Sequence, residues 1–80
     1  MFVAFNLKTH KNVINFDTVC EFTVHYTEEE PKMVIFINDS SEPWCWTFVN
    51  KEALEQTYND IIMGLYKKDT FISIPADRLA

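Results

Sequence analysis

Hydrophobic and polar residues alternate along much of the chain, in the period-two pattern of β-strands with one buried and one solvent-facing side. Residues 18–26 show this pattern most clearly. The apolar side of this predicted strand comprises Cys20, Phe22, Val24 and Tyr26, and the polar side comprises Glu21, Thr23 and His25. Residues 13–17 are either a separate short strand or a bulged approach to this one.

Further strands are predicted between clusters of turn-forming residues. They are residues 2–7, 33–37, 44–49 and 70–74. Every position of 33–37 is apolar, which favours a central strand that is covered on both faces. Pro75 stops the last strand, and the tail that follows, residues 76–80, is expected to be frayed or loosely helical.

An amphipathic helix is predicted from Asn50, a good N-cap residue, to Lys67 and Lys68. Its apolar stripe, which we expect to cover a sheet, comprises Leu54, Tyr58, Ile61, Ile62, Leu65 and Tyr66. One flank of the stripe carries Ala53, Thr57, Asp60 and Gly64. This small-residue flank either abuts the sheet or faces water, or it lets a second copy of the helix approach closely. In the last case the self-association residues are Ala53, Thr57 and Gly64.

Together these elements predict a single domain, residues 1–80, of the α+β class. We expect a mostly antiparallel sheet of four to six strands with one amphipathic C-terminal helix packed on one face. The strand, helix and strand of residues 44–74 are a crossover connection if both strands lie parallel in one sheet. The sheet face away from the helix needs a cover, which a second copy, a curled sheet or a partner protein could supply.

The composition favours a folded domain and argues against several functions. Of the 80 residues, 48% are hydrophobic and 15% aromatic, whereas disordered chains are poor in aromatic residues. The formal net charge of −5 argues against direct binding to nucleic acid and against docking on an anionic membrane. The first residues do not resemble a secretory signal, and no segment reaches the ~20 apolar residues of a membrane span. We therefore expect a cytoplasmic protein in which Cys20 and Cys45 are buried free thiols.

No catalytic or cofactor-binding pattern stands out. The single glycine, Gly64, excludes a glycine-rich phosphate-binding loop. The histidines and cysteines have the atom types of zinc ligands, but their spacing lacks the close pairs of a compact zinc site. Cys20 and His25 fall on opposite sides of the predicted strand, which argues against a nucleophile and base pair. We therefore predict no metal, no cofactor and no enzymatic activity.

Two acidic loops are among the most distinctive features of the chain. Glu28, Glu29 and Glu30 are consecutive in one predicted turn, and Asp39 and Glu42 lie in the next loop. Both loops are either solvated turns or an acidic face that a basic partner recognises.

Two tryptophans follow the second acidic loop on one side of the predicted strand. We expect Trp46 to anchor the core, because a domain of this size needs its large side chains there. Trp44 lies next to Pro43 at the start of the strand, and we expect it to be the more exposed of the two. Tryptophan is enriched at binding hot spots, so Trp44 is a candidate contact residue.

Three stretches carry a resemblance to known proteins. They follow the predicted N-terminal strand and are Asn-Val-Ile-Asn-Phe-Asp-Thr-Val at 12–19, the apolar strand at 33–37, and Val-Asn-Lys-Glu-Ala-Leu-Glu at 49–55, which leads into the amphipathic helix. In this order they resemble small uncharacterised proteins of phages and mobile elements and, over residues 5–62, the small flagellar FlbD-like proteins, which have an Asn-x-Asp-x-Ile step between short strands. The chain lacks that family's glycine-bearing turns, and its loop at 38–43 is longer. The resemblance therefore carries over no functional residue.

These observations predict a non-enzymatic protein-interaction module, a small acidic inhibitor or adaptor of the phage type. Its partner is expected to be a host protein with a basic surface, one that handles nucleic acid or acts in defence, in the host cytoplasm. The predicted partner-binding residues are Glu28, Glu29, Glu30, Asp39, Glu42 and Trp44. Two alternatives stay open. One is a structural homo-oligomer, such as a homodimer, that assembles through its sheet face or helix flank. The other is a small-ligand-binding domain or enzyme with an aromatic pocket around Trp44, Trp46 and Tyr58.

Overall fold

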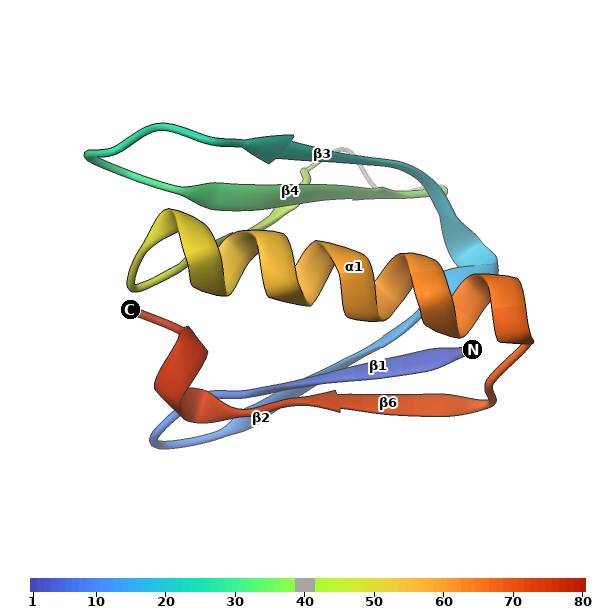
Figure 1. Cartoon of the computed structure of the whole chain (residues 1–80). Coiled ribbons are helices and arrows are strands. Elements are labelled where there is room, and N and C mark those ends of the chain that lie inside the picture. Colours follow the sequence, from blue (N-terminus) through green and yellow to red (C-terminus); the bar gives the residue numbers. More distant parts are fainter. Residues whose placement is uncertain (39–41) are drawn as a thin grey trace.

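The computed structural model describes residues 1–38 and 42–80, and Figure 1 shows their arrangement. This part of the chain contains six strands and one α-helix. The strands are β1 (Phe2–Asn6), β2 (Lys11–Asn15), β3 (Val19–His25), β4 (Lys32–Ile37), β5 (Trp44–Thr47) and β6 (Phe71–Ile74), and the helix is α1 (Lys51–Lys67). Two short 3₁₀ turns, η1 (Phe16–Thr18) and η2 (Ala76–Arg78), follow β2 and β6.

The described strands form two three-stranded sheets. Sheet A has the order β2-β1-β6, and sheet B has the order β3-β4-β5. Their pairings are antiparallel except that of β1 with β6, which is parallel. In Figure 1 the two sheets lie one above the other, and α1 runs along one side between them. The α+β class is confirmed, but the strands divide into two sheets where one was predicted, so α1 leads from one sheet to the other.

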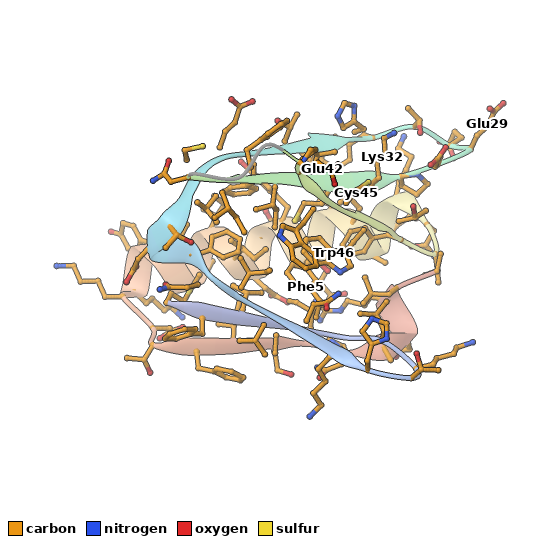
Figure 2. All side chains as sticks on the ribbon, turned by 180° about the vertical axis from the view of Figure 1, so that it is seen from behind. Phe5, Glu29, Lys32, Glu42, Cys45 and Trp46 are labelled. Atoms are coloured by element: carbon orange, nitrogen blue, oxygen red, sulfur yellow. The ribbon has the colours of Figure 1, made fainter. Side chains whose placement is uncertain are left out.

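The core lies between the inner faces of the two sheets and the buried side of α1. The apolar side chains that are at most 2% exposed are Val3, Phe5, Met33, Ile35, Phe48, Leu54, Ile61 and Ile74. Figure 2, which shows the molecule from behind, places Phe5 and Trp46 between the sheets. Their rings are stacked with centroids 4.0 Å apart, so this aromatic contact joins sheet A to sheet B.

A β-bulge in β3 moves Cys20 to the surface. The register between β3 and β4 shifts at this residue, so Cys20 leaves the alternation that places Phe22 and Val24 against the core. Its thiol donates a hydrogen bond to the carbonyl oxygen of Phe36, 3.4 Å away. Cys45 is exposed as well. The prediction that both cysteines are buried is therefore wrong: they are free thiols at the surface.

The outer face of sheet B is not fully covered by the described chain. β4 is the central strand, as its apolar sequence predicts, and Met33 and Ile35 are buried on its inner face. On the outer face Val34 is partly buried and Phe36 is 39% exposed. The prediction that this strand is covered on both faces is therefore wrong, because each sheet buries only the face that it turns toward the other.

Sheet A also carries apolar residues on its outer face. Phe2 is the cross-strand neighbour of Phe71, and Ala4 is the neighbour of Val13. The three large side chains of this group, Phe2, Val13 and Phe71, are 47%, 54% and 55% exposed. Neither sheet therefore has a second layer of the described chain over its outer face.

α1 is rotated about its own axis relative to the prediction. Its buried residues are Ala53, Leu54, Thr57, Ile61 and Gly64. Ile62, Leu65 and Tyr66, which the periodicity assigned to the buried stripe, are 38%, 42% and 82% exposed. The cause is close packing along the small-residue flank: a Cβ added at Gly64 would lie 2.9 Å from Sδ of Met1 and 3.3 Å from Cγ2 of Ile72. The flank without bulky side chains is thus the one that lies against sheet A.

The C-terminal tail is part of the fold. Leu79 forms a β-bridge with Phe48 and is 6% exposed. The backbone N–H of Ala80 donates a hydrogen bond to the carbonyl oxygen of Thr47 at 2.9 Å. The turn η2 matches the helical alternative for the tail, but the prediction of fraying is wrong, because Leu79 contributes to the core and its backbone lies beside the end of β5.

Candidate protein-interaction surface

The turn between β3 and β4 carries three consecutive glutamates at one end of sheet B. Glu28, Glu29 and Glu30 are all exposed, and we call them the acidic tip. Figure 2 shows Glu29 at the end of this hairpin, directed away from the body of the protein. The turn that the sequence predicted is therefore present, and its carboxylates face solvent.

Hydrogen bonds on both sides of the acidic tip hold its backbone. The N–H of Glu30 donates to Oγ1 of Thr27 at 3.1 Å. Pro31, which closes the turn, is buried, and its carbonyl oxygen accepts a hydrogen bond from the N–H of Phe48 at 2.8 Å. The tip is therefore joined to the segment that follows β5, and its carboxylates project from a held backbone.

One glutamate of the acidic tip also contacts the helix. Nζ of Lys51, in the first turn of α1, lies 3.1 Å from Oε1 of Glu28. Both side chains are substantially exposed, and exposed ion pairs contribute little to stability. The pair therefore orients Glu28 more than it stabilises the fold.

An open groove of about 800 Å³ lies beside the acidic tip. Its lining includes a row of cross-strand neighbours on the outer face of sheet B, His25, Lys32 and Thr47. Thr27 and the acidic tip complete the lining. The lining carries three carboxylates and one lysine, and Lys51 is paired with one of the carboxylates. The groove therefore keeps a net negative charge, which suits a positively charged segment.

Tyr26 follows β3 at the base of the acidic hairpin. Burial raises the pKa of its phenol above the ordinary value of 10.0, and the nearby Glu55 and Tyr58 raise it further, because they disfavour a second negative charge. The phenol therefore stays neutral at physiological pH, and the negative charge of this region comes from carboxylates.

Three aromatic rings form a column from the core to the surface. The ring of Trp46 is stacked on Phe5. Trp44 lies on the same face of β5, with its ring centroid 5.9 Å from that of Trp46 and an interplanar angle of 11°. Trp46 is 4% exposed and Trp44 is 42% exposed. The prediction that Trp46 belongs to the core and that Trp44 is the exposed one is confirmed.

Tyr58, the third residue of the predicted aromatic pocket, lies against Phe22 with ring centroids 5.9 Å apart.

The structure divides the predicted partner-binding residues between two places. The acidic tip precedes β4, whereas Glu42 and Trp44 belong to the connection and strand that follow it. Trp44 is the neighbour of Ile35 in the sheet, and Figure 2 shows Glu29 apart from Glu42. Glu42 is exposed, and Asp39 lies outside the described residues. These residues therefore do not form one continuous site in the described part of the chain.

The residues predicted for self-association are buried inside the folded chain. Ala53 is 8% exposed, Thr57 is 0% exposed, and Gly64 is buried against Met1 and Ile72. The alternative that the small-residue flank abuts the sheet is what the structure shows. These side chains are therefore not exposed for contact with a second copy.

An apolar patch on the solvent side of α1 was not predicted from the sequence. It consists of Ile62, Met63 and Tyr66, all of them exposed. The small residues of the opposite flank are the signal that could have revealed it, because a helix side without bulky side chains can approach a sheet most closely. Hydrophobicity alone favoured the other orientation of the helix.

The remaining observations concern metals, membranes and related proteins. Among the described residues, no three histidine, cysteine, aspartate or glutamate side chains are placed to hold a metal ion. No helix in residues 1–38 and 42–80 has the length and apolar character needed to cross a membrane. Comparisons with protein-family models, with curated proteins and with solved structures find no match.

Proposed function

We propose that the protein is a non-enzymatic protein-interaction module that binds a basic surface of another protein through its acidic tip. The observation that carries this proposal is the display of three exposed glutamates on a hairpin end whose backbone is held by hydrogen bonds. Because the backbone of the acidic tip is already held in place, it loses little conformational entropy when a partner binds, and this favours affinity. The groove beside the tip offers further polar contacts from sheet B.

The proposed partner is a protein that handles nucleic acid. Such proteins carry basic surfaces that bind phosphates, and carboxylates can occupy the same positions through charge-assisted hydrogen bonds. The net charge of −5 adds long-range attraction to a basic partner and repulsion from nucleic acid itself. In the cell the protein would then act on a host protein as a small inhibitor or adaptor of the phage type.

The test is affinity purification from the cells in which the protein occurs, with identification of bound proteins by mass spectrometry. The test variant is Glu28→Gln/Glu29→Gln/Glu30→Gln. The matched control, Glu21→Gln/Asp69→Asn/Asp77→Asn, removes the same charge at exposed positions elsewhere. We expect the tip variant to lose the partner and the control to keep it, with unchanged melting temperatures in both.

Two results would contradict the proposal. One is capture of the same proteins with the same affinity by the tip variant. The other is equal loss of the partner in the tip variant and the control, which would show that only overall charge matters. Competition provides a further check: a nucleic acid that the captured partner binds should displace the wild-type protein from it.

A further inference from the structure

The solvent side of the second half of α1 is apolar. Ile62, Met63 and Tyr66 are 38%, 47% and 82% exposed. Because residues three and four apart on a helix are neighbours on its surface, these side chains form one patch, which we call the helix patch. α1 forms the near side of the molecule in Figure 1.

The helix patch exists because of the way α1 packs on sheet A. The small-residue flank at Ala53, Thr57 and Gly64 takes the buried position, so long apolar side chains are left on the outside. A contiguous apolar patch with charged residues at its margins is typical of a protein-binding surface.

The net charge of α1 changes along its length. Glu52 and Glu55 make its first half negative, because the positive charge of Lys51 is paired with Glu28. At its end Lys67 and Lys68 outweigh the neighbouring Asp69. The macrodipole of the helix favours this distribution within one chain. The helix therefore presents a negative end, a positive end and an apolar patch between the two.

We propose that a second copy of the chain docks on this side of α1, with the two helices antiparallel. The glutamates at the start of each helix then lie beside the lysines at the end of the other. Ile62 and Met63 lie next to the midpoint between Glu55 and Lys67, so the two helix patches meet near the centre of the contact. A parallel arrangement is disfavoured because it places like charges together. A two-fold dimer contains each of these contacts twice.

The proposed dimer contact uses none of the three glutamates of the acidic tip, so failure of the dimer and failure of the proposed function can be distinguished by separate variants. Sedimentation velocity over a concentration series measures the association. One variant, Glu52→Lys/Glu55→Lys, makes both ends of the helix positive, and the other, Lys67→Glu/Lys68→Glu, makes both ends negative. We expect each variant alone to dimerise about tenfold more weakly than the wild type, because the contact is lost twice in each dimer.

Mixing the two charge variants provides the decisive measurement. Each supplies the charges that the other lacks, so an equimolar mixture should form a heterodimer, which native mass spectrometry detects by its mass. Recovery of dimerisation on mixing also excludes misfolding as the reason why each variant alone dimerises weakly. The control Glu21→Lys/Asp77→Lys changes the net charge by the same amount as the first variant and should dimerise like the wild type.

Three results would overturn the proposal. The first is a wild-type protein that stays monomeric up to its highest soluble concentration. The second is a mixture of the charge variants that forms no heterodimer. The third is a dimer that is unaffected by the helix variants but dissociates on Val13→Lys/Phe71→Lys, because that result would place the interface on the outer face of sheet A.

Discussion

The thiols of Cys20 and Cys45 face solvent because of the local geometry of two strands. Cys20 occupies the bulge in β3, and Cys45 is exposed on β5 beside Val34. We expect both thiols to react with dithiodipyridine in the folded protein, because access does not require unfolding. Release of two equivalents of thiopyridone without denaturant, one for each cysteine of the chain, is the expected result. Thiols that react only after addition of urea would contradict it.

The raised pKa of Tyr26 links proton binding to folding. The folded protein holds the phenolic proton more tightly than the unfolded chain, where tyrosine ionises near its ordinary pKa of 10.0. The resulting contribution to stability is fully present below that value and is lost as the pH rises through the higher pKa of the folded state. Tyr26→Phe should therefore weaken the loss of stability at alkaline pH.

Urea denaturation at a series of alkaline pH values measures this effect. Tyr66→Phe is the matched control, since its side chain is 82% exposed. An equal decline of stability with pH in the wild type and in Tyr26→Phe would show that Tyr26 does not contribute.

At the scale of the elements, the contact between α1 and sheet A depends on Gly64. Gly64→Val is expected to lower the free energy of unfolding by about 1–3 kcal/mol, the usual cost of overpacking, since Met1 and Ile72 already lie close to this position. Gly64→Ala should be nearly neutral, because the gain in helix propensity of about 1 kcal/mol is offset by the tighter contact.

Urea denaturation of both variants, with Asn59→Val as a control at an exposed position of the same helix, tests this prediction. The control reports the cost of a β-branched residue in the helix without a new contact. A Gly64→Val protein as stable as the control would mean that the helix and the sheet have room for the added methyl groups.

The boundaries of the elements were largely predictable, because they depend on local patterns. The alternation of apolar and polar residues predicted the position of β3. Asn50 predicted the start of α1, and Oδ1 of Asn50 accepts a hydrogen bond from the N–H of Ala53 at 2.8 Å. The bulge at Cys20 was not predictable, since an inserted residue leaves the composition of a strand unchanged. The rotation of α1 was not predictable from hydrophobicity, because it is set by how closely Gly64 lets the helix approach the sheet.

At the scale of the whole molecule, the stacking of Phe5 on Trp46 joins the two sheets. Trp46→Ala is expected to lower the free energy of unfolding by about 3–5 kcal/mol, a large part of the stability of a small domain. Trp44→Ala should cost less than half as much, because that side chain is already 42% exposed. Chemical denaturation followed by far-ultraviolet circular dichroism measures both variants. Equal losses would contradict the assignment of Trp46 to the core and Trp44 to the surface.

The division into two sheets could not be predicted from local patterns. β1 pairs with β6, which comes from the other end of the chain, and such a pairing leaves no mark on the sequence around either strand. The position of the acidic tip was predictable, because turn residues and Pro31 mark it. Its separation from Trp44 was not, since it depends on how β4 and β5 pair in three dimensions.

The parallel pairing of β1 with β6 also determines the order in which the fold can be completed. Sheet B is built from neighbouring segments between Val19 and Thr47, so it can form from local contacts. Sheet A must bring Phe2–Asn6 to Phe71–Ile74, and closing so long a loop costs entropy and slows folding. During synthesis the edge of β1 that faces away from β2 cannot be paired until β6 has been made. Closing that edge is the step that completes sheet A, after α1 has carried the chain back across the molecule.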